Sequence, residues 1–545
     1  MIEHQHRNMA WSALGGYTVA VLAGLLVLAV LRAYSAGFSG ADEPAHFLNG
    51  YFVSNYLQTH AGANPMAYAV EYYLHYPKIS IGHWPPAYYG MLGVLFLALP
   101  PSPEMAFAIN LIVAALPAAM MALALASLTG PRTAIAGCLL YALTPLAVES
   151  QAFFMLDQAL TACCMAATLA WLGYLRQPGW RRALLFSGLC TVAVLIKGNG
   201  WLIVLMPLFH MLLARGWRVL TKPHLYVAAA LAGAIIIPWY WLTSSISADG
   251  FNYRAGWPYA LHALSANLRT LLYSLGYVSV PLVVAGVAME YRQRQSMPTR
   301  WATVSAGLAL ILATLTLQSL VPADIDDRYL APALPAYAAL AMLGLFHCCS
   351  AAGRAATLPI AMLLMLAMLA PGAVHLANRV PKVDLRAAEI EPAGTLSPPT
   401  VWVIDGSSGA EGAVIAHLAV HDPALRHYAV RASKLLAASD FMGARYELKY
   451  TDAHAVLDEL MRLGVQYVVL VRLNNEAPFP HSAQLSAAMQ LPDAPFRRVS
   501  ALPHRNRPGV TEVYAFSGVA VANESAIRQL GVPAKSGNLV HLTAK

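Results

Sequence analysis

The stretch WSALGGYTVAVLAGLLVLAVLRAYSAGFSGADEPAHF, residues 11–47, joins an apolar run to an acidic pair. The run from Trp11 to Leu31 is long enough to cross the hydrocarbon core of a bilayer as a helix. It is also longer than the apolar region of a secretory signal, so we expect a retained signal anchor rather than a cleaved peptide. Asp42 and Glu43 follow at the mouth of this helix. A charged side chain at a membrane edge is unfavourable unless water solvates it or it serves a function. The pair therefore marks the first candidate site.

The composition is that of a polytopic membrane protein. Of the 545 residues, 58% are hydrophobic and 11% are charged, and the mean hydropathy is +0.53. Soluble domains carry about 25% charged residues. The net charge of +8 does not require a nucleic-acid partner, and we expect none. Most of the excess Lys and Arg lies in short loops between apolar segments, as the positive-inside rule predicts for a membrane protein. The six cysteines lie in apolar stretches, and we interpret them as small core residues rather than disulfides or ligands. They are Cys138, Cys163, Cys164, Cys190, Cys348 and Cys349.

The basic loops predict the orientation. Short loops rich in Lys and Arg belong on the cytoplasmic face, and they alternate here with loops that should face outward. The segment from Tyr88 to Leu99 is apolar but short and bounded by prolines, so we expect it to lie against the outer face or dip into it. We therefore predict about 11 spans, with the N-terminus inside and the C-terminus outside. The inward loops are Gly130–Arg132, Arg176–Arg182, Arg215–Lys222, Tyr291–Arg300 and the region of Arg354; the outward ones carry Asp157, Lys197, Asp249–His262 and Asp324–Arg328.

The chain changes character at Lys382, so we predict a membrane domain over residues 1–381 and an outer α/β domain over residues 382–545. Between a strand and a helix lies the glycine-rich turn Asp405–Gly412. Its spacing does not match the dinucleotide fingerprint, so we interpret it as a tight turn rather than a phosphate cradle. The expected strands are Thr400–Ile404 and Gln466–Leu473, and the expected helices are Ala410–Val420 and Ala453–Leu463.

The first outward loop, residues 33–85, is too long for a plain connector. It mixes tyrosines with Asp42, Glu43, His46, Glu71, His75, Lys78 and His83. Aromatic rings stack on the apolar faces of a sugar and carboxylates accept from its hydroxyls, although an interfacial aromatic belt is the alternative for the tyrosines. Asp42 could be only a helix cap, because Pro44 suggests a helix start. A cap does not explain Glu43 and His46 in the same turn.

Four motifs follow one another on the expected outer side. Asp42-Glu43 with His46 leads to HWPPAYY at residues 83–89, then to FMLDQAL at 154–160, LIKGNG at 195–200 and DRYLAPALP at 327–335. In this order they resemble the integral-membrane GT-C glycosyltransferases, in particular bacterial relatives of the protein O-mannosyltransferases and of lipid A aminoarabinose transferase. Trp84 is inserted relative to the family's His-Pro-Pro stretch, and Ile196 stands where Thr is usual. The resemblance covers roughly Trp11 to Pro371.

The resemblance implies a GT-C fold and transfer of a hexose or pentose from a polyprenyl-phosphate donor, with inversion at the anomeric carbon. The acceptor would be a glycolipid, a polysaccharide or a protein outside the inner membrane of a bacterium. The implied base is Asp42, with Glu43 and Asp157 as further catalytic residues. The implied donor-phosphate ligands are Lys197, Arg328, Tyr329, Lys78 and His83, and the implied substrate contacts are His46 and Tyr88.

Alternatives remain for these residues. Lys197 could snorkel to the interface, Arg328 could pair with Asp326 or Asp324, and Asp157 could cap a helix. We expect no cofactor and no essential metal, since the histidines of the first loop lack tight ligand spacing. A transporter or flippase is a rival function, but the polar groups cluster on one face and no pair of interrupted helices repeats. A scaffold that presents the outer domain is the second rival.

Overall fold

The computed structural model describes residues 2–80, 82–244, 246, 251, 253–351, 354–390, 399–439, 445–474, 476–533 and 539–541. The chain divides into two compact units. Unit 1 comprises Met1–Val30, Gly82–Tyr88 and Ala108–Val380, and unit 2 comprises Leu31–Ile81, Tyr89–Phe107 and Pro381–Lys545. The last segment of unit 2 thus begins beside the domain boundary predicted at residue 382, and most of the first outward loop belongs to the same unit.

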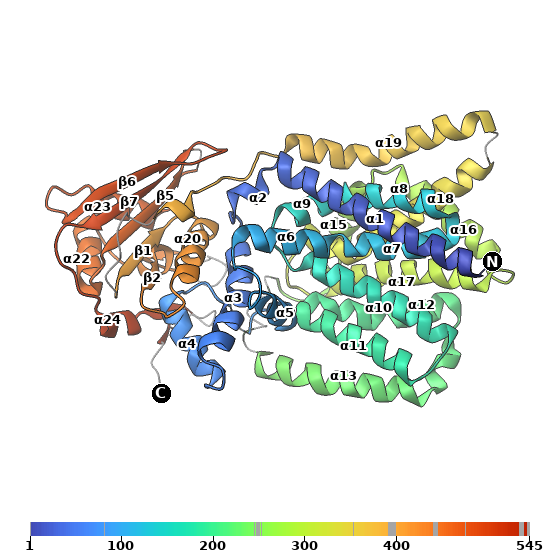
Figure 1. The fold of residues 1–545 in the computed structure, drawn as a ribbon, viewed down its shortest axis with the longest axis horizontal. Coiled ribbons are helices and arrows are strands. Elements are labelled where there is room, and N and C mark those ends of the chain that lie inside the picture. The colour runs from blue at the N-terminus through green and yellow to red at the C-terminus, as the bar shows by residue number, and fades with distance from the viewer. Residues whose placement is uncertain are drawn as a thin grey trace. The chain divides into compact units, whose positions relative to one another are not determined.

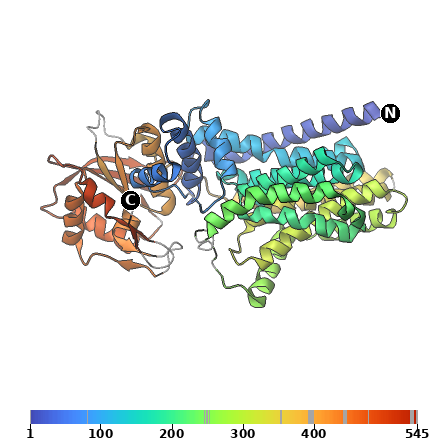
Figure 2. The ribbon, with the colours of Figure 1, turned by 90° about the horizontal axis from the view of Figure 1, so that it is seen from below.

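Unit 1 is a bundle of helices that lie side by side (Figure 1). Both views place α1 along α7 and α8, with the N-terminus at one end of the bundle (Figure 2). The helices are α1 (Ile2–Val30), α7 (Leu116–Thr129), α8 (Pro131–Ala142), α9 (Pro145–Ala152), α10 (Asp157–Arg176), α11 (Trp180–Ile196), η1 (Gly198–Trp201), α12 (Leu202–Ala214), η2 (Trp217–Thr221), α13 (Pro223–Leu242), α15 (Trp257–Ser274), α16 (Ser279–Arg292), α17 (Pro298–Leu320), η3 (Asp327–Ala333), α18 (Leu334–Ala351) and α19 (Arg354–Asn378).

Among the described residues, seven helices are long and apolar enough to cross a membrane. The number rises to nine if each of two bent pairs, α8 with α9 and α15 with α16, forms one span. A multi-pass membrane protein is confirmed, whereas the count of about 11 spans and the orientation remain predictions. Helix α5 (Ala87–Leu95) has 9 residues, or about 14 Å at ~1.5 Å per residue, which is too short to cross. This supports the expectation for residues 88–99.

Small residues let the helices of unit 1 approach closely. A Cβ added to Gly344 of α18 would lie 1.8 Å from the carbonyl oxygen of Leu282 in α16, so the two backbones are in direct contact. Such contacts are typical of helix packing in membranes, where van der Waals complementarity replaces the hydrophobic effect. Of the six cysteines expected in the core, Cys138, Cys164 and Cys190 are buried, whereas the other three are half-buried.

Unit 2 contains a five-stranded sheet of order β2-β1-β5-β7-β6. Strand β1 is parallel to β2 and β5, whereas β7 is antiparallel to β5 and β6, so the predicted α/β domain is confirmed. Its elements are α2 (Ala33–Ala36), α3 (Glu43–Thr59), α4 (Pro65–His75), η4 (Ala387–Glu389), β1 (Val401–Asp405), α20 (Ser408–His421), β2 (Tyr428–Arg431), α21 (Ala432–Leu435), β3 (Ala437–Ala438), β4 (Glu447–Leu448), α22 (Ala453–Leu463), β5 (Tyr467–Leu473), α23 (Pro480–Met489), β6 (Phe496–Pro503), β7 (Gly509–Phe516), α24 (Glu524–Arg528), β8 (Gly531–Pro533) and β9 (Leu539–His541). Helices α5 and α6 (Pro103–Ala114) contribute residues to both units.

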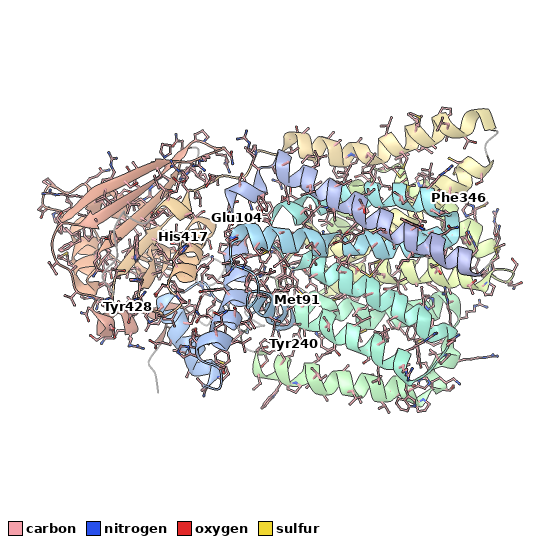
Figure 3. All side chains as sticks on the ribbon, viewed as in Figure 1. Met91, Glu104, Tyr240, Phe346, His417 and Tyr428 are labelled. Atoms are coloured by element: carbon pink, nitrogen blue, oxygen red, sulfur yellow. The ribbon has the colours of Figure 1, made fainter. Side chains whose placement is uncertain are left out.

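The sheet has apolar residues on both faces. Val401 and Val403 join a core with residues of α22 and α23, and alternation along β1 turns Trp402 to the other face, where α20 packs. Leu74 of α4 enters the same core. The ring of His75 stacks on Tyr428 of β2 with centroids 4.2 Å apart (Figure 3 labels Tyr428). This packing explains why the first outward loop and the C-terminal residues form one unit.

Candidate active site

The acidic pair opens helix α3 in unit 2. Asp42 is the N-cap and Glu43 the first helical residue, and Pro44 occupies the first turn as expected. The carboxylate of Asp42 makes no capping hydrogen bond to the helix. Asp42 is half-buried, whereas Glu43 is fully buried. The side chain of Asp42 therefore does not cap α3, so capping does not explain this residue.

Glu43 is held by a buried cation and two backbone groups. Its Oε2 atom accepts hydrogen bonds from the amides of Ser39 and Gly40 at 2.9 and 2.7 Å. Lys382 Nζ donates to both carboxylate oxygens, at 2.8 and 3.0 Å. Burial lowers the pKa of Lys382, and the facing carboxylate opposes that shift. These contacts fix the turn that carries Asp42, so the geometry of Glu43 is that of a positioning residue.

Helix α20 packs against the turn that carries Asp42. A Cβ added to Gly409 would lie 2.2 Å from the carbonyl oxygen of Ser39, and one added to Gly412 would lie 2.9 Å from Pro44 Cβ. Ser407 caps the helix by accepting from the amide of Ala410 at 3.3 Å. The glycine-rich segment is thus a tight helix entry, as predicted. Its glycines allow α20 to touch the loop that carries the acidic pair.

Lys78 also binds α20. Its Nζ donates to the carbonyl and the hydroxyl of Ser408, both at 2.9 Å, and the residue is buried. Burial lowers the pKa of Lys78 to about 7. The amine thus has a local partner in Ser408, and its expected role as a phosphate ligand stays a prediction.

His46 lies one turn beyond the acidic pair and is buried. Its Nδ1 shares a hydrogen bond of 2.8 Å with the hydroxyl of Tyr89. The two rings stack with their centroids 6.1 Å apart. Tyr89, which follows Tyr88 in the sequence, therefore holds His46 in place. The expected contact of His46 with substrate remains a proposal.

A second cluster lies in unit 1, where α10 begins and α11 ends. Lys197 Nζ donates to Asp157 Oδ1 at 2.7 Å, and both residues are buried. Lys197 turns inward rather than snorkelling, and Asp157 is the first helical residue after the N-cap Leu156. Within the described residues, Asp157 Oδ2 accepts no hydrogen bond. A buried acceptor without a donor is unfavourable, so this oxygen is suited to a ligand hydroxyl.

Tyr329 of η3 lies next to two cations. Its ring centroid is 4.6 Å from Lys197 Nζ and 5.6 Å from Arg328 Cζ, within the range of cation–π attraction. Arg328 Nε also pairs with Asp326 Oδ2 at 2.8 Å, so the local ion pair considered from the sequence is present. The side chains of that pair are 27% and 35% exposed, which leaves the guanidinium accessible to an anion. The motifs at residues 154–160, 195–200 and 327–335 therefore meet in space.

The remaining predicted residues flank this cluster in unit 1. Tyr88 is buried and packs against Phe154, with ring centroids 6.2 Å apart. His83 is half-buried and meets the inserted Trp84 edge to face at 4.7 Å. In the part of the chain that the structure describes, no group of three His, Cys, Asp or Glu side chains is placed to hold a metal ion.

Known proteins match this chain in part of its sequence and in its fold. The family model described as dolichyl-phosphate-mannose-protein mannosyltransferase matches residues 85–241, which include Tyr88, Asp157 and Lys197. The crystal structure of ArnT from Cupriavidus metallidurans bound to undecaprenyl phosphate superposes with a TM-score of 0.52 at 13% identity, covering 91% of this chain and 97% of that chain. The apo structure of the same enzyme gives 0.53 at 14% identity, covering 92% and 98%. The chain shares its fold with these structures, and residues 85–241 match the mannosyltransferase family model. The predicted resemblance is thereby confirmed, and comparison with curated protein sequences gives no significant match.

Lys382 is a site residue whose role the sequence did not indicate. It lies 339 residues from Glu43, and no motif or spacing connects the two. Its place in the sequence, where the composition changes, gives no sign of an acidic partner. Glu71 and His75 were noted as polar residues of the first loop, and they contact Arg528 and Tyr428 instead.

Proposed function

We propose that the protein transfers a sugar from a polyprenyl-phosphate donor to an acceptor on the outer face of a bacterial inner membrane. The observation that carries this proposal is the buried pair of Lys197 and Asp157 beside Tyr329 and Arg328. An ammonium has three N–H donors, so the bond to Asp157 leaves two for a phosphate. The relative that superposes on this chain binds undecaprenyl phosphate, which supports a donor of this lipid class.

The cations act on the leaving group. As the bond between the anomeric carbon and the phosphate oxygen breaks, negative charge grows on the lipid phosphate. Lys197 and Arg328 stabilise that charge, and the apolar surroundings strengthen the interaction because water does not screen it. Asp157 holds Lys197 in place, and its second oxygen accepts from a hydroxyl of the sugar. A single phosphate group is matched by these cationic side chains.

Asp42 acts on the acceptor. Its carboxylate removes the proton from the acceptor hydroxyl or amine as that atom attacks the anomeric carbon, and the sugar leaves the phosphate with inverted configuration. The buried pair of Glu43 and Lys382 keeps the turn of Asp42 in one conformation. His46 and Tyr88 supply substrate contacts.

The test is a transfer assay with the full-length protein in lipid vesicles. Labelled polyprenyl-phosphate hexoses and pentoses serve as donors, and a membrane extract serves as acceptor. We expect label in a new product, and we expect Asp42→Asn to lower the rate by about 10²- to 10⁴-fold with the fold intact. Asp452→Asn is the matched control, because Asp452 is also an N-cap of unit 2 and Asn retains capping ability.

Two results would contradict the proposal. Transfer by Asp42→Asn at the rate of the control would remove Asp42 as the base. Movement of the labelled donor across the bilayer without any covalent product would identify a flippase instead.

A further inference from the structure

A cavity of about 1100 Å³ opens to the surface of unit 1 and is bounded by α12, η2, α16 and α17. Its walls are apolar, with Leu212, Val284 and Val287 among the lining residues. Four cations line it as well, Arg215, Arg218, Lys222 and Arg294, and no lining residue is Asp or Glu. A volume of this size accommodates a ligand of several tens of heavy atoms. The cavity therefore combines apolar walls with four cations and no anionic side chain.

The cavity is separate from the cluster around Lys197. Lys197 precedes η1 and α12, whereas Arg215 follows α12. The helix has 13 residues, which at ~1.5 Å per residue is about 20 Å. The cavity lies toward the end of unit 1 where Figure 1 labels α16 and the N-terminus. A ligand bound by the four cations thus does not occupy the proposed donor site.

No carboxylate within the described ranges neutralises these cations. Arg294 donates to the carbonyl of its neighbour Tyr291 at 2.9 Å and stacks over that ring at 3.9 Å. The nearby Arg300 is different, because its Nε binds the buried Glu290 at 3.0 Å. Glu290 therefore neutralises Arg300, whereas the four cations that line the cavity can bind an external anion.

Aromatic side chains place the cationic end at the depth of lipid headgroups. Trp217 of η2 and Tyr291 of α16 are 42% and 45% exposed, and such residues concentrate at membrane–water interfaces. Arg215 ends α12 in the left-handed conformation, with φ of 55°, and so reverses the chain between the helix and η2. Arg218 and Lys222 follow within the same short turn. The basic end thus lies at the interface, and the apolar walls extend from it along the helices.

We propose that this cavity binds an anionic phospholipid of the membrane. The lipid phosphate contacts Arg215, Arg218, Lys222 and Arg294, and an acyl chain lies against Leu212, Val284 and Val287. Basic pockets between membrane helices are suited to anionic headgroups. A free anion would use only the cations and leave the apolar interior empty, so the amphipathic lining favours a lipid.

The test measures lipid retention by native mass spectrometry on the full-length protein in detergent. The probes are phosphatidylglycerol, which is anionic, and phosphatidylcholine, which is zwitterionic. We expect phosphatidylglycerol to bind more tightly, and the double variant Arg215→Gln/Arg218→Gln to weaken its binding about fivefold or more. The matched control is Arg132→Gln/Arg181→Gln, which removes two exposed arginines of other basic loops that do not line the cavity.

A second variant separates loss of the site from loss of the fold. Val284→Trp fills the cavity without changing its charge, and we expect it to weaken phosphatidylglycerol binding while the thermal unfolding temperature stays near that of the wild type. The proposal is overturned if both lipids bind equally, or if Arg215→Gln/Arg218→Gln and Val284→Trp bind as the control does. Preferential binding of a polyprenyl phosphate over phosphatidylglycerol at the same residues would also overturn it.

Discussion

Lys382 and Glu43 form a buried ion pair in unit 2, with Nζ 2.8 Å from Oε1. The carboxylate also accepts from the backbone amides of Ser39 and Gly40, so one cation and two amides hold the turn before Asp42. Lys382 thus helps to shape the loop that precedes α3. This gives the C-terminal segment a structural role at the acidic pair in addition to its own folded sheet.

The first prediction concerns Lys382→Met. The substitution leaves a buried carboxylate without its cation, and we expect a loss of about 3–5 kcal/mol in stability together with reduced transfer. Thermal unfolding and the transfer rate of the full-length protein measure the two effects. Adding Glu43→Gln removes the uncompensated charge, so the double variant should recover part of the lost stability. Unchanged unfolding of Lys382→Met would show that the pair contributes nothing.

The second prediction concerns Gly409→Ala. The new methyl group would lie 2.2 Å from the carbonyl oxygen of Ser39, so α20 or the acidic loop must shift. We expect lower transfer with a modest loss of stability, measured by kcat and by the unfolding temperature. Gly90→Ala is the control, because Gly90 is also helical and a Cβ there meets nothing within 4 Å. Equal activity of the two variants would contradict a close role of α20.

The structure explains which parts of the site were predictable. Asp157 and Lys197 are 40 residues apart, and both were expected on the outer side because basic loops alternate with the loops that carry them. Topology therefore brought them to one end of the helices, and pairing of opposite buried charges followed. One predicted strand and one predicted helix of the α/β domain were equally readable, since β5 covers Tyr467–Leu473 and α22 covers Ala453–Leu463 within a residue of expectation. Strands β2, β6 and β7 were not predicted.

The roles of Lys78 and Lys382 were not predictable. Each cation is used by a partner from the other end of the chain, Ser408 for Lys78 and Glu43 for Lys382. Such contacts depend on how the first loop folds onto the C-terminal residues, and no periodicity records that. Hydropathy identified apolar segments well, but bent pairs such as α8 with α9 make the number of spans depend on geometry rather than composition.

The third prediction tests the cluster in unit 1. Lys197→Met removes the buried ammonium, and we expect the transfer rate to fall by about 10²- to 10³-fold. Asp157→Asn keeps the shape and one acceptor oxygen but weakens the hold on Lys197, so we expect a smaller loss. If Asp157 acts through Lys197, Lys197→Met/Asp157→Asn should be no slower than Lys197→Met alone. Independent, multiplicative losses would show that Asp157 acts on the substrate directly.

The fourth prediction concerns pH and Lys78, whose pKa is lowered by burial from 10.5 to about 7. Between these two values the unfolded chain holds a proton that the folded protein has released, so unfolding takes up a proton and stability rises with pH. Below pH 7 the amine is protonated in both states, and this contribution no longer changes. We therefore expect the wild type to gain more in unfolding temperature from pH 7 to pH 9 than Lys78→Met gains.

Lys222→Met is the matched control for this pH series, because Lys222 is exposed and its loss should leave the slope of the wild type intact. Unfolding temperatures of the full-length protein at pH 6, 7, 8 and 9 provide the comparison. If Lys78→Met keeps the slope of the wild type, the ammonium is not the group that releases the proton. A slope that disappears with Lys78→Met alone would show that Lys78 is the group that releases the proton on folding.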